Sequence, residues 1–336
     1  MGDSRRTGMV GESGPRKGRH VALRRSRPAA ALAVLASLVL LGLVVGACVS
    51  PPIAPIAAGE PGAAGPCDFE RTDLVNTADW RHPVFVLEPT GAGRPYTGGS
   101  CDDDERPVVL LAHGYLGNIY EGYEGLLRHL VSNGYVVVFP GYTAAYDPEH
   151  QYAVVDNGFR QGVGFSDRVD NSRTGFVGHS FGGGMLYWLI QRSEARGWGS
   201  EAVWAVNFAP YFALQNPGDG AIDLPDHIRF TMVSYDNDVF VDTRIAIEQF
   251  AALDTPDEAA QHVAVFSDRS RSPAIEADHI GPVTVEVLPG LGTINTDHYD
   301  HWVAFRSIDA TGRCALDGTW CDTDLGYTGT WPDGTP

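Results

Sequence analysis

Short apolar runs recur along the chain between residues 84 and 288. Several are unbroken by polar residues, which is typical of strands that are buried on both faces of a parallel sheet. The predicted strands are Val84–Leu87, Val108–Ala112, Tyr135–Phe139, Thr174–Val177, Ala202–Phe208, Ile228–Ser234 and Val283–Leu288.

Stretches with helical spacing of apolar residues lie between several of these strands. Helices are predicted at Tyr123–Val131, which Asn133-Gly134 ends, from Met185 through Ile190, and at Phe240–Leu253. The alternation of strands and helices predicts an α/β fold with right-handed crossovers, built on a doubly wound, mostly parallel sheet flanked by helices. The segment Thr255–Pro282 is poorly patterned and could lie over a site, but no long apolar insertion indicates a large lid.

The first 48 residues resemble an export signal. A basic stretch ends at Arg27, and an apolar run of about 20 residues follows, from Pro28 to Ala47. The run leads into Val45-Gly46-Ala47-Cys48, which is similar to a bacterial lipobox, where cleavage leaves a lipid-bearing cysteine at the new N-terminus. We predict a signal peptide over residues 1–48 and a lipid anchor at Cys48; an uncleaved anchor helix is the alternative. Either predicts an exported, extracytoplasmic protein that is anchored to the cell membrane or released by secretion.

Residues 49–66 are rich in Pro, Ala and Gly and predict an extended tether, followed by a single domain over residues 67–336. Four cysteines lie in that domain, an even number that suits two disulfides in an oxidising compartment. Cys314 and Cys321 are close in sequence and separated by turn residues, so we expect them to pair and to leave Cys67 with Cys101.

The charge of the chain is divided unevenly. Eight of the 24 Lys and Arg residues and two of the 42 Asp and Glu residues lie within 1–48, so 16 basic and 40 acidic residues remain, a formal charge of −24. Such a body would repel nucleic acid and anionic lipid head groups. The composition therefore excludes a nucleic-acid-binding function. The protein is expected to be a monomer.

The pentapeptide Gly178-His179-Ser180-Phe181-Gly182 matches the pattern G-x-S-x-G. This pattern forms a tight strand-to-helix turn that strains the serine backbone and lifts its hydroxyl clear of the sheet. Here an apolar strand precedes the motif and a predicted helix follows it, which is the context that the motif requires. The sequence therefore predicts Ser180 as a nucleophile.

A serine nucleophile of this kind needs two backbone N–H groups to bind the oxyanion of its intermediate. One belongs to the residue after the nucleophile, Phe181. The other comes from the loop after an earlier strand, where His113-Gly114-Tyr115 follows Val108–Ala112. We predict Tyr115 and Phe181 as the donors and a structural role for His113; a plain strand-ending turn is the alternative.

The acid and the histidine of such a site follow the serine in chain order. The acid belongs just past the end of a later strand, and Asp238 and Asp236 both follow Ile228–Ser234; Asp238 is preferred. The histidine is expected after the last strand, where His298 is preferred over His301 as the general base.

The remaining histidines and acidic residues predict no metal site. Asp297, His298, Asp300 and His301 are close together, but their spacing matches no known metal motif. His262 and His279 are interpreted as surface residues. No cofactor is expected.

With these residues in place, the chain resembles the α/β-hydrolase superfamily, and within it the branch of chlorophyllases, dienelactone hydrolases and cutinase-like polyester hydrolases. Two segments carry the specific similarity, Pro107 to Thr143 and Thr174 to Met185, and the similarity at the level of the fold spans Val84 to Phe305. The resemblance implies an α/β-hydrolase fold with the nucleophile at Ser180.

The resemblance also implies the oxyanion donors Tyr115 and Phe181 and the acid Asp238. This chain departs from the family in two places: Tyr235 replaces the glycine of the family's Gly-x-x-Asp, and the loop before His298 is longer than usual. Residues 306–336 have no recognised counterpart in the family.

The expected activity is hydrolysis of carboxylic esters, in small molecules or polymers, through an acyl-enzyme intermediate. Two alternatives stay open. One is a peptidase or amidase on the same fold, and the other is a surface lipoprotein that binds a ligand without catalysis.

Overall fold

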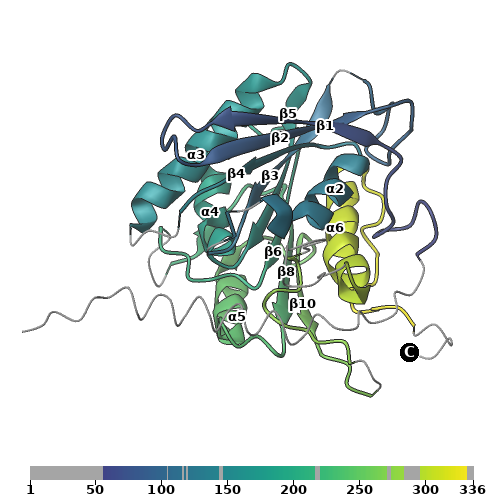
Figure 1. Ribbon diagram of the computed structural model, residues 1–336. Helices are drawn as coiled ribbons and strands as arrows, with labels where there is room; N and C mark the ends of the chain where they lie inside the picture. Colours follow the sequence, from purple (N-terminus) through teal and green to yellow (C-terminus); the bar gives the residue numbers. More distant parts are fainter. Residues whose placement is uncertain are drawn as a thin grey trace, which may run out of the picture. The chain divides into compact units, whose positions relative to one another are not determined.

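An eight-stranded mixed sheet with helices on both faces organises the chain (Figure 1). A computed structural model describes residues 56–103, 105–115, 117–118, 120–143, 147–215, 220–270, 274–283 and 296–330. The predicted signal peptide with Cys48, and most of the predicted strand Val283–Leu288, lie outside these residues. No helix within the described ranges is long and apolar enough to span a membrane.

The strand order across the sheet is β1-β2-β4-β3-β5-β6-β8-β10. The pairs β1–β2 and β2–β4 are antiparallel, and every other neighbouring pair is parallel. The strands are β1 (Asp68–Val75), β2 (Pro83–Thr90), β3 (Arg106–Ala112), β4 (Val136–Pro140), β5 (Val169–His179), β6 (Ala202–Phe208), β8 (Arg229–Tyr235) and β10 (Ala260–Val265). A separate two-stranded ribbon joins β7 (Ile222–Asp223) to β9 (Leu253–Asp254).

The central strands β3, β4 and β6 are buried along their whole length, as their unbroken apolar sequences predict. Successive residues of a strand point to opposite faces, so each strand contributes to two apolar cores. In β3, Val109 and Leu111 belong to one core, and Val108 and Leu110 belong to the other.

Each core is closed by its own group of helices (Figure 1). Helices α2 and α6 cover one face, and α3, α4 and α5 cover the other. The helices are α2 (Glu124–Ser132), α3 (Pro148–Phe165), α4 (Phe181–Glu194), α5 (Thr243–Ala251) and α6 (Arg306–Asp317), with a 3₁₀ turn η1 (Tyr120–Gly122) and a π-helical turn η2 (Asp300–Phe305).

The predicted α/β class and the mostly parallel sheet are confirmed, and six of the predicted strands correspond to β2, β3, β4, β5, β6 and β8. Helix α4 begins at Phe181, four residues before the predicted start. The strands β1, β7, β9 and β10, the helices α3 and α6 and the short turns η1 and η2 were not predicted. Strands β1 and β10 are half-exposed, and β1 is mostly polar. Helix α3 carries a signal that could have identified it, the N-cap Asp147 followed by Pro148.

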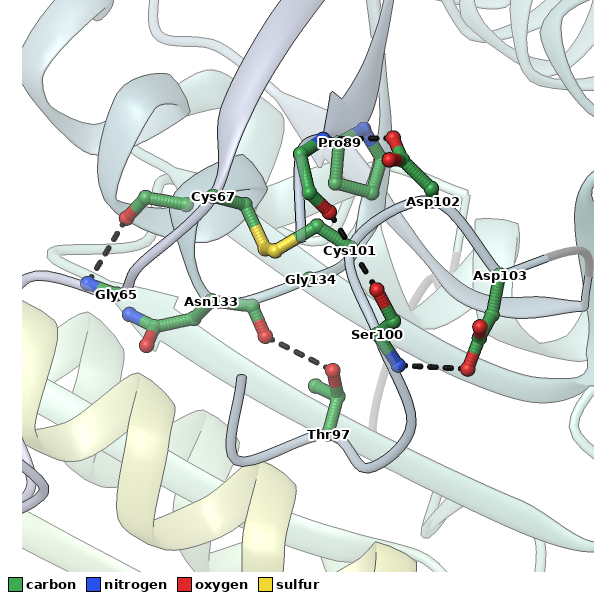
Figure 2. The surroundings of a disulfide bond; sticks show 12 residues. Gly65, Cys67, Pro89, Thr97, Ser100, Cys101, Asp102, Asp103, Asn133 and Gly134 are labelled. Atoms are coloured by element: carbon green, nitrogen blue, oxygen red, sulfur yellow. Dashed lines mark hydrogen bonds between the residues drawn. A yellow bond between two sulfur atoms is a disulfide. The ribbon is translucent and has the colours of Figure 1, made fainter. Parts of the chain in front are cut away.

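Both predicted disulfides are present, Cys67–Cys101 and Cys314–Cys321. Figure 2 shows the first, which ties the chain before β1 to the loop between β2 and β3. The backbone on either side is held as well, because Gly65 N–H donates to Ser132 Oγ (3.1 Å) and Cys67 N–H donates to Ser132 O (3.1 Å). Disulfides are compatible with the predicted location outside the cytoplasm.

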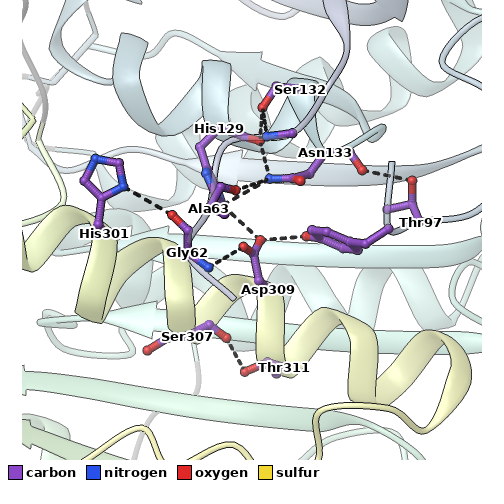
Figure 3. Close-up of polar contacts among 12 residues, drawn as sticks. Gly62, Ala63, Thr97, His129, Ser132, Asn133, His301, Ser307, Asp309 and Thr311 are labelled. Atoms are coloured by element: carbon purple, nitrogen blue, oxygen red, sulfur yellow. Dashed lines mark hydrogen bonds and ion pairs between the residues drawn. The ribbon is translucent and has the colours of Figure 1, made fainter. Parts of the chain in front are cut away.

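The last residues of the predicted tether pack on the domain (Figure 3). Gly62 N–H donates to the carboxylate of Asp309 in α6 (2.7 Å), and Asn133 Nδ2 donates to Ala63 O (3.4 Å). Gly62 has φ +94°, and a Cβ there would lie 2.4 Å from His301 O, so only glycine fits. A Pro- and Gly-rich composition alone does not show whether a segment is extended or bound.

Candidate functional site

Ser180 lies on the turn that joins β5 to α4, in a strained backbone conformation. Its φ is 54° and its ψ is −119°, a region that residues with a side chain rarely adopt and that costs about 1–3 kcal/mol. The surroundings fix this conformation, because Ser180 N–H donates to Phe208 O (3.0 Å) and Tyr211 N–H donates to Ser180 O (2.7 Å). This is the strand-to-helix turn that G-x-S-x-G predicts.

The glycines of the motif are required by close backbone contacts. A Cβ at Gly182 would lie 2.1 Å from Ala112 O, and one at Gly178 would lie 2.9 Å from Gly183 Cα. Both contacts are shorter than a carbon atom allows. The strand end, the turn and the first turn of α4 can therefore meet only if these positions lack side chains.

The side chain of Ser180 begins a hydrogen-bonded series of three residues. Ser180 Oγ lies 2.9 Å from His279 Nε2, and His279 Nδ1 lies 2.7 Å from Asp238 Oδ2. The other carboxylate oxygen of Asp238 accepts from the N–H groups of Phe240 (2.9 Å) and Val241 (2.8 Å). Because an ionised carboxylate only accepts, the proton of a neutral His279 is on Nδ1, and Nε2 is left to accept from the Ser180 hydroxyl.

Three segments far apart in the chain bring this series together. Ser180 follows β5, Asp238 follows β8, and His279 lies in the segment after β10. Strands β5, β6, β8 and β10 are parallel, so their C-terminal ends lie along one edge of the sheet, where sites of open α/β sheets assemble. All three side chains are largely shielded: Ser180 and His279 are 7% and 8% exposed as residues, and the side chain of Asp238 is 2% exposed.

The prediction of His298 as the partner of Ser180 is wrong, because His279 occupies that position. His298 Nε2 faces Thr328 O instead, and its ring stacks on Trp302 at 6.0 Å. The alternative His301 is also elsewhere, with Nδ1 3.2 Å from Gly62 O. The interpretation of His279 as a surface residue is wrong as well.

The histidine was missed because β10 was missed. Val265 at the end of β10 pairs with Tyr235 at the end of β8, so the segment after β10 starts beside the turn that carries Asp238. The signal that could have identified this strand is the short apolar run Val263-Ala264-Val265-Phe266 within Thr255–Pro282. The choice of Asp238 over Asp236 agrees with the structure: Asp236 Oδ1 accepts from Ser267 N (2.9 Å), as a turn residue does.

Both predicted oxyanion donors lie beside the serine. Phe181 is the first residue of α4, so its N–H has no partner within the helix. On the other side, Gly114 packs on Ser180, and a Cβ there would lie 3.2 Å from Ser180 Cβ. The ring of Tyr115 contacts the ring of Phe181 at 6.3 Å, edge to face. The role of the two amides as oxyanion donors stays a prediction.

His113 has the structural role that was predicted for it. It is fully buried and stacks on Tyr142 at 3.9 Å, and its Nε2 accepts from Tyr142 N–H (3.2 Å). Burial lowers the pKa of His113 to about 3, so the ring is neutral at physiological pH. It therefore carries no proton to or from the site.

Exposed aromatic side chains surround the shielded series. Tyr115, Phe212 and Phe240 are 49%, 50% and 61% exposed, and Phe240 lies 5.5 Å from the His279 ring. Tyr211 connects Phe181 to Phe212 through ring contacts. Exposed apolar side chains thus lie next to the site, while Ser180 and its two partners are largely shielded.

The arrangement is suited to nucleophilic chemistry by the serine hydroxyl with the histidine as its base. Within the described ranges, no group of three or more His, Cys, Asp or Glu side chains is placed to hold a metal ion. No protein-family model and no curated protein matches this sequence. The case for this site therefore depends on its own geometry.

Proposed function

We propose that this protein is a serine hydrolase that cleaves carboxylic esters, built on an α/β-hydrolase fold. One observation carries the proposal: the continuous series Ser180 Oγ, His279, Asp238, at 2.9 and 2.7 Å, which starts from a serine with φ 54°. A buried histidine between a serine and a carboxylate is the arrangement that activates a hydroxyl for attack on an acyl carbon.

The reaction follows from the donors and acceptors at the site. Ser180 Oγ attacks the acyl carbon while His279 Nε2 takes the hydroxyl proton, and Asp238 stabilises the imidazolium that forms. The backbone N–H groups of Tyr115 and Phe181 bind the oxyanion of the tetrahedral intermediate. His279 then returns the proton to the departing alkoxide, which leaves an acyl-enzyme on Ser180. Water, deprotonated by His279, attacks the acyl group and releases the acid.

The fold and the sequence resemblance support the same proposal. The serine follows the central parallel strand β5, and the acid and the histidine follow β8 and β10 at the same edge of the sheet. The chain order serine, acid, histidine is that of the α/β-hydrolase superfamily. The exposed aromatic rim fits the apolar part of an ester, in a small molecule or a polymer.

The test is an assay of the purified protein, as wild type and as Ser180→Ala, on p-nitrophenyl esters from acetate to palmitate. Loss of the nucleophile is expected to lower kcat/KM by at least about a thousandfold. His298→Ala is a matched control, because its side chain faces Thr328 rather than Ser180. Equal rates in wild type and Ser180→Ala would contradict the proposal.

The same assay with p-nitroanilides separates an esterase from an amidase, because the chemistry of the site allows both. A fluorophosphonate probe adds a readout that does not depend on the choice of substrate, since it labels an activated serine. Absence of labelling at Ser180 in the folded wild type would leave the binding lipoprotein as the remaining interpretation.

We also propose that lipid on Cys48 holds the protein at the outer face of a cell membrane. The lipobox-like Val45-Gly46-Ala47-Cys48 and the two disulfides support this location. In a bacterial host, Cys48→Ser is expected to remove labelling by radioactive palmitate and to shift the protein out of the detergent phase. Unchanged partitioning would favour an uncleaved anchor helix.

A further inference from the structure

His179, the residue between Gly178 and Ser180, takes part in a second hydrogen-bonded series beside the site. Its Nε2 lies 2.8 Å from the backbone carbonyl oxygen of His279, and its Nδ1 lies 2.6 Å from Tyr123 Oη. Gly114 N–H donates to the same Tyr123 oxygen (2.8 Å). The series therefore connects the loop before Tyr115 with the backbone of the proposed base.

The direction of every hydrogen bond in this series is fixed by its two ends. Gly114 N–H can only donate, and the His279 carbonyl can only accept. His179 must then carry its proton on Nε2, so Nδ1 accepts, and the Tyr123 hydroxyl donates to it. Burial lowers the pKa of His179 well below its usual value, and burial also raises the pKa of Tyr123. Both groups are therefore neutral, and the series has a single arrangement of protons.

The backbone that this series holds lies in a loop rather than in a helix or strand. The neighbouring hydrogen bonds are local or lie to one side of His279: Ile280 N–H to Asp278 Oδ1 (3.1 Å), Gly281 N–H to Asp278 O (3.1 Å) and Asn237 N–H to Ala277 O (3.0 Å). The bond from His179 ties the peptide of His279 to the nucleophile turn. A displacement of about 1 Å at a reacting group can cost about a hundredfold in rate.

We propose that Tyr123 and His179 are positioning residues, which hold the His279 backbone and the Gly114 turn in fixed register on either side of Ser180. The inference rests on the proposed function, because it assigns these residues a part in the same reaction. Neither residue exchanges a proton with substrate. They act by keeping the base and the oxyanion loop in place while charge develops between them.

The experiment compares Tyr123→Phe, His179→Leu, His179→Gln and the double variant Tyr123→Phe/His179→Leu in the full protein. The control is Tyr187→Phe, which removes a buried tyrosine hydroxyl that bonds Gln249 and Asn207 under the other face of the sheet. Steady-state kinetics on a p-nitrophenyl ester, the rate of fluorophosphonate labelling at Ser180 and the melting temperature are measured for each variant.

Tyr123→Phe and His179→Leu are each expected to lower kcat by about 10- to 100-fold with KM within about twofold of wild type. The double variant is expected to lose no more than His179→Leu alone, because both changes cut one series. His179→Gln is expected to recover part of the loss, since its amide N–H can still donate to the His279 carbonyl. Tyr187→Phe is expected to keep wild-type kcat even if its melting temperature falls.

Two outcomes would overturn the inference. One is wild-type kcat and labelling rate in folded Tyr123→Phe and His179→Leu. The other is multiplication of the two losses in the double variant, which would mean two independent effects on packing. Either is distinct from failure of the proposed function, in which the wild type itself would neither hydrolyse esters nor label at Ser180.

If the wild type is inactive, NMR of protein with ¹⁵N-labelled histidine still decides whether the series exists. It is expected to show His179 as the neutral Nε2–H tautomer from pH 5 to pH 8, with the Nδ1 signal moved in Tyr123→Phe. A His179 that titrates in this range, or that carries its proton on Nδ1, would contradict the inference.

Discussion

Two clusters in this molecule are each made of an aspartate, a histidine and a hydroxyl group. The first is Ser180, His279 and Asp238. The second is Tyr96, His129 and Asp309, which connects the loop before β3 with α2 and α6. Figure 3 shows His129 and Asp309. The two clusters have the same kinds of groups and similar distances, and only one has the arrangement of a catalytic site.

The order of the groups makes the difference. In the first cluster the histidine lies between the hydroxyl and the carboxylate, so one ring nitrogen can take the hydroxyl proton while the other is held by Asp238. In the second the carboxylate lies in the middle: Asp309 Oδ1 accepts from Tyr96 Oη (2.7 Å) and faces His129 Nε2 (2.9 Å), and Oδ2 accepts from Gly62 N–H. The Tyr96 hydroxyl therefore donates directly to the carboxylate, and the histidine does not lie between the two groups.

Both clusters are largely shielded from solvent, since Ser180 and His279 are 7% and 8% exposed and His129 is 5% exposed. Asp309 is 1% exposed, and burial, with Asp309 beside it, raises the pKa of Tyr96 well above its usual value. The His129 ring stacks on Phe305 at 4.2 Å. The first cluster lies at a strand edge beneath exposed aromatic side chains, and the second holds the N-terminal segment, α2 and α6 together. A list of residue types does not distinguish such clusters, but the order of their hydrogen bonds does.

The largest contrast is expected between the two histidines. His279→Ala should lower kcat by about 10⁴-fold or more with little change in stability, because the base is removed from Ser180. His129→Ala should leave kcat of the folded protein unchanged and lower the free energy of unfolding by about 3 kcal/mol, since Asp309 loses a buried partner. Ester kinetics and urea denaturation of both variants measure this. A large loss of kcat in folded His129→Ala would contradict the assignment of a purely structural role to the second cluster.

Replacing the aspartate of each cluster by asparagine, at Asp238 and at Asp309, tests the same comparison. In Asp238→Asn the amide oxygen should stay with the N–H groups of Phe240 and Val241, which leaves NH₂ facing His279 Nδ1. His279 would then carry its proton on Nε2 and could not accept from Ser180, so kcat should fall by about 10³- to 10⁴-fold.

In Asp309→Asn an acceptor oxygen becomes a donor whichever way the amide turns. The expected cost is about 1–3 kcal/mol of unfolding free energy with unchanged kcat. The same kinetic and denaturation measurements apply to both aspartates. Equal behaviour of the two variants would show that the order of the groups is not what matters.

The disulfide Cys67–Cys101 fixes the end of the N-terminal segment whose Gly62 binds Asp309 and whose Gly65 binds Ser132 (Figure 2). Replacing both cysteines by serine should lower the unfolding free energy by about 4 kcal/mol, because a sequence separation of 34 constrains the unfolded chain strongly. The pair Cys314–Cys321, with a separation of 7, should cost about 2–3 kcal/mol. Calorimetry tests the ranking, and kcat of the folded proteins should not change. The reverse ranking would contradict the chain-entropy argument.

The last prediction concerns the pH dependence of stability and Asp278, which is next to the proposed base. Burial raises the pKa of Asp278 to about 6, so the folded protein binds this proton more tightly than the unfolded chain. Its contribution to stability is complete below a pH of about 4 and is lost as the pH rises through 6, at most about 3 kcal/mol.

Asp278→Asn keeps an oxygen for Ile280 N–H and removes this titration. The variant should therefore be more stable than wild type at pH 7.5, and the difference should shrink toward pH 5. Denaturation curves across this range measure it. Identical pH dependence in both proteins would show that Asp278 does not titrate in the fold.

The sequence by itself determined the features that depend on local pattern. Unbroken apolar runs located the buried strands, and the glycines around Ser180 located a turn whose backbone contacts exclude any Cβ. The number and spacing of the cysteines predicted both disulfides. Asp238 was predicted because it follows Ser180 in the chain and lies just past the end of a strand, which is β8. In each case the signal can be read directly from the residues or from their order, although the contact that it serves can be distant, as between Gly182 and Ala112 O.

Only the tertiary structure decided which histidine meets Ser180. His279 and His298 are both downstream, near aspartates and in segments with little periodicity, so no local property ranks them. The choice depends on the parallel pairing of β10, a half-exposed strand, with β8, because this pairing starts the segment that carries His279 beside Asp238. The roles of His179 and Asp309 were hidden for the same reason: their hydrogen-bond partners lie 100 and 180 residues away, and only folding brings them together.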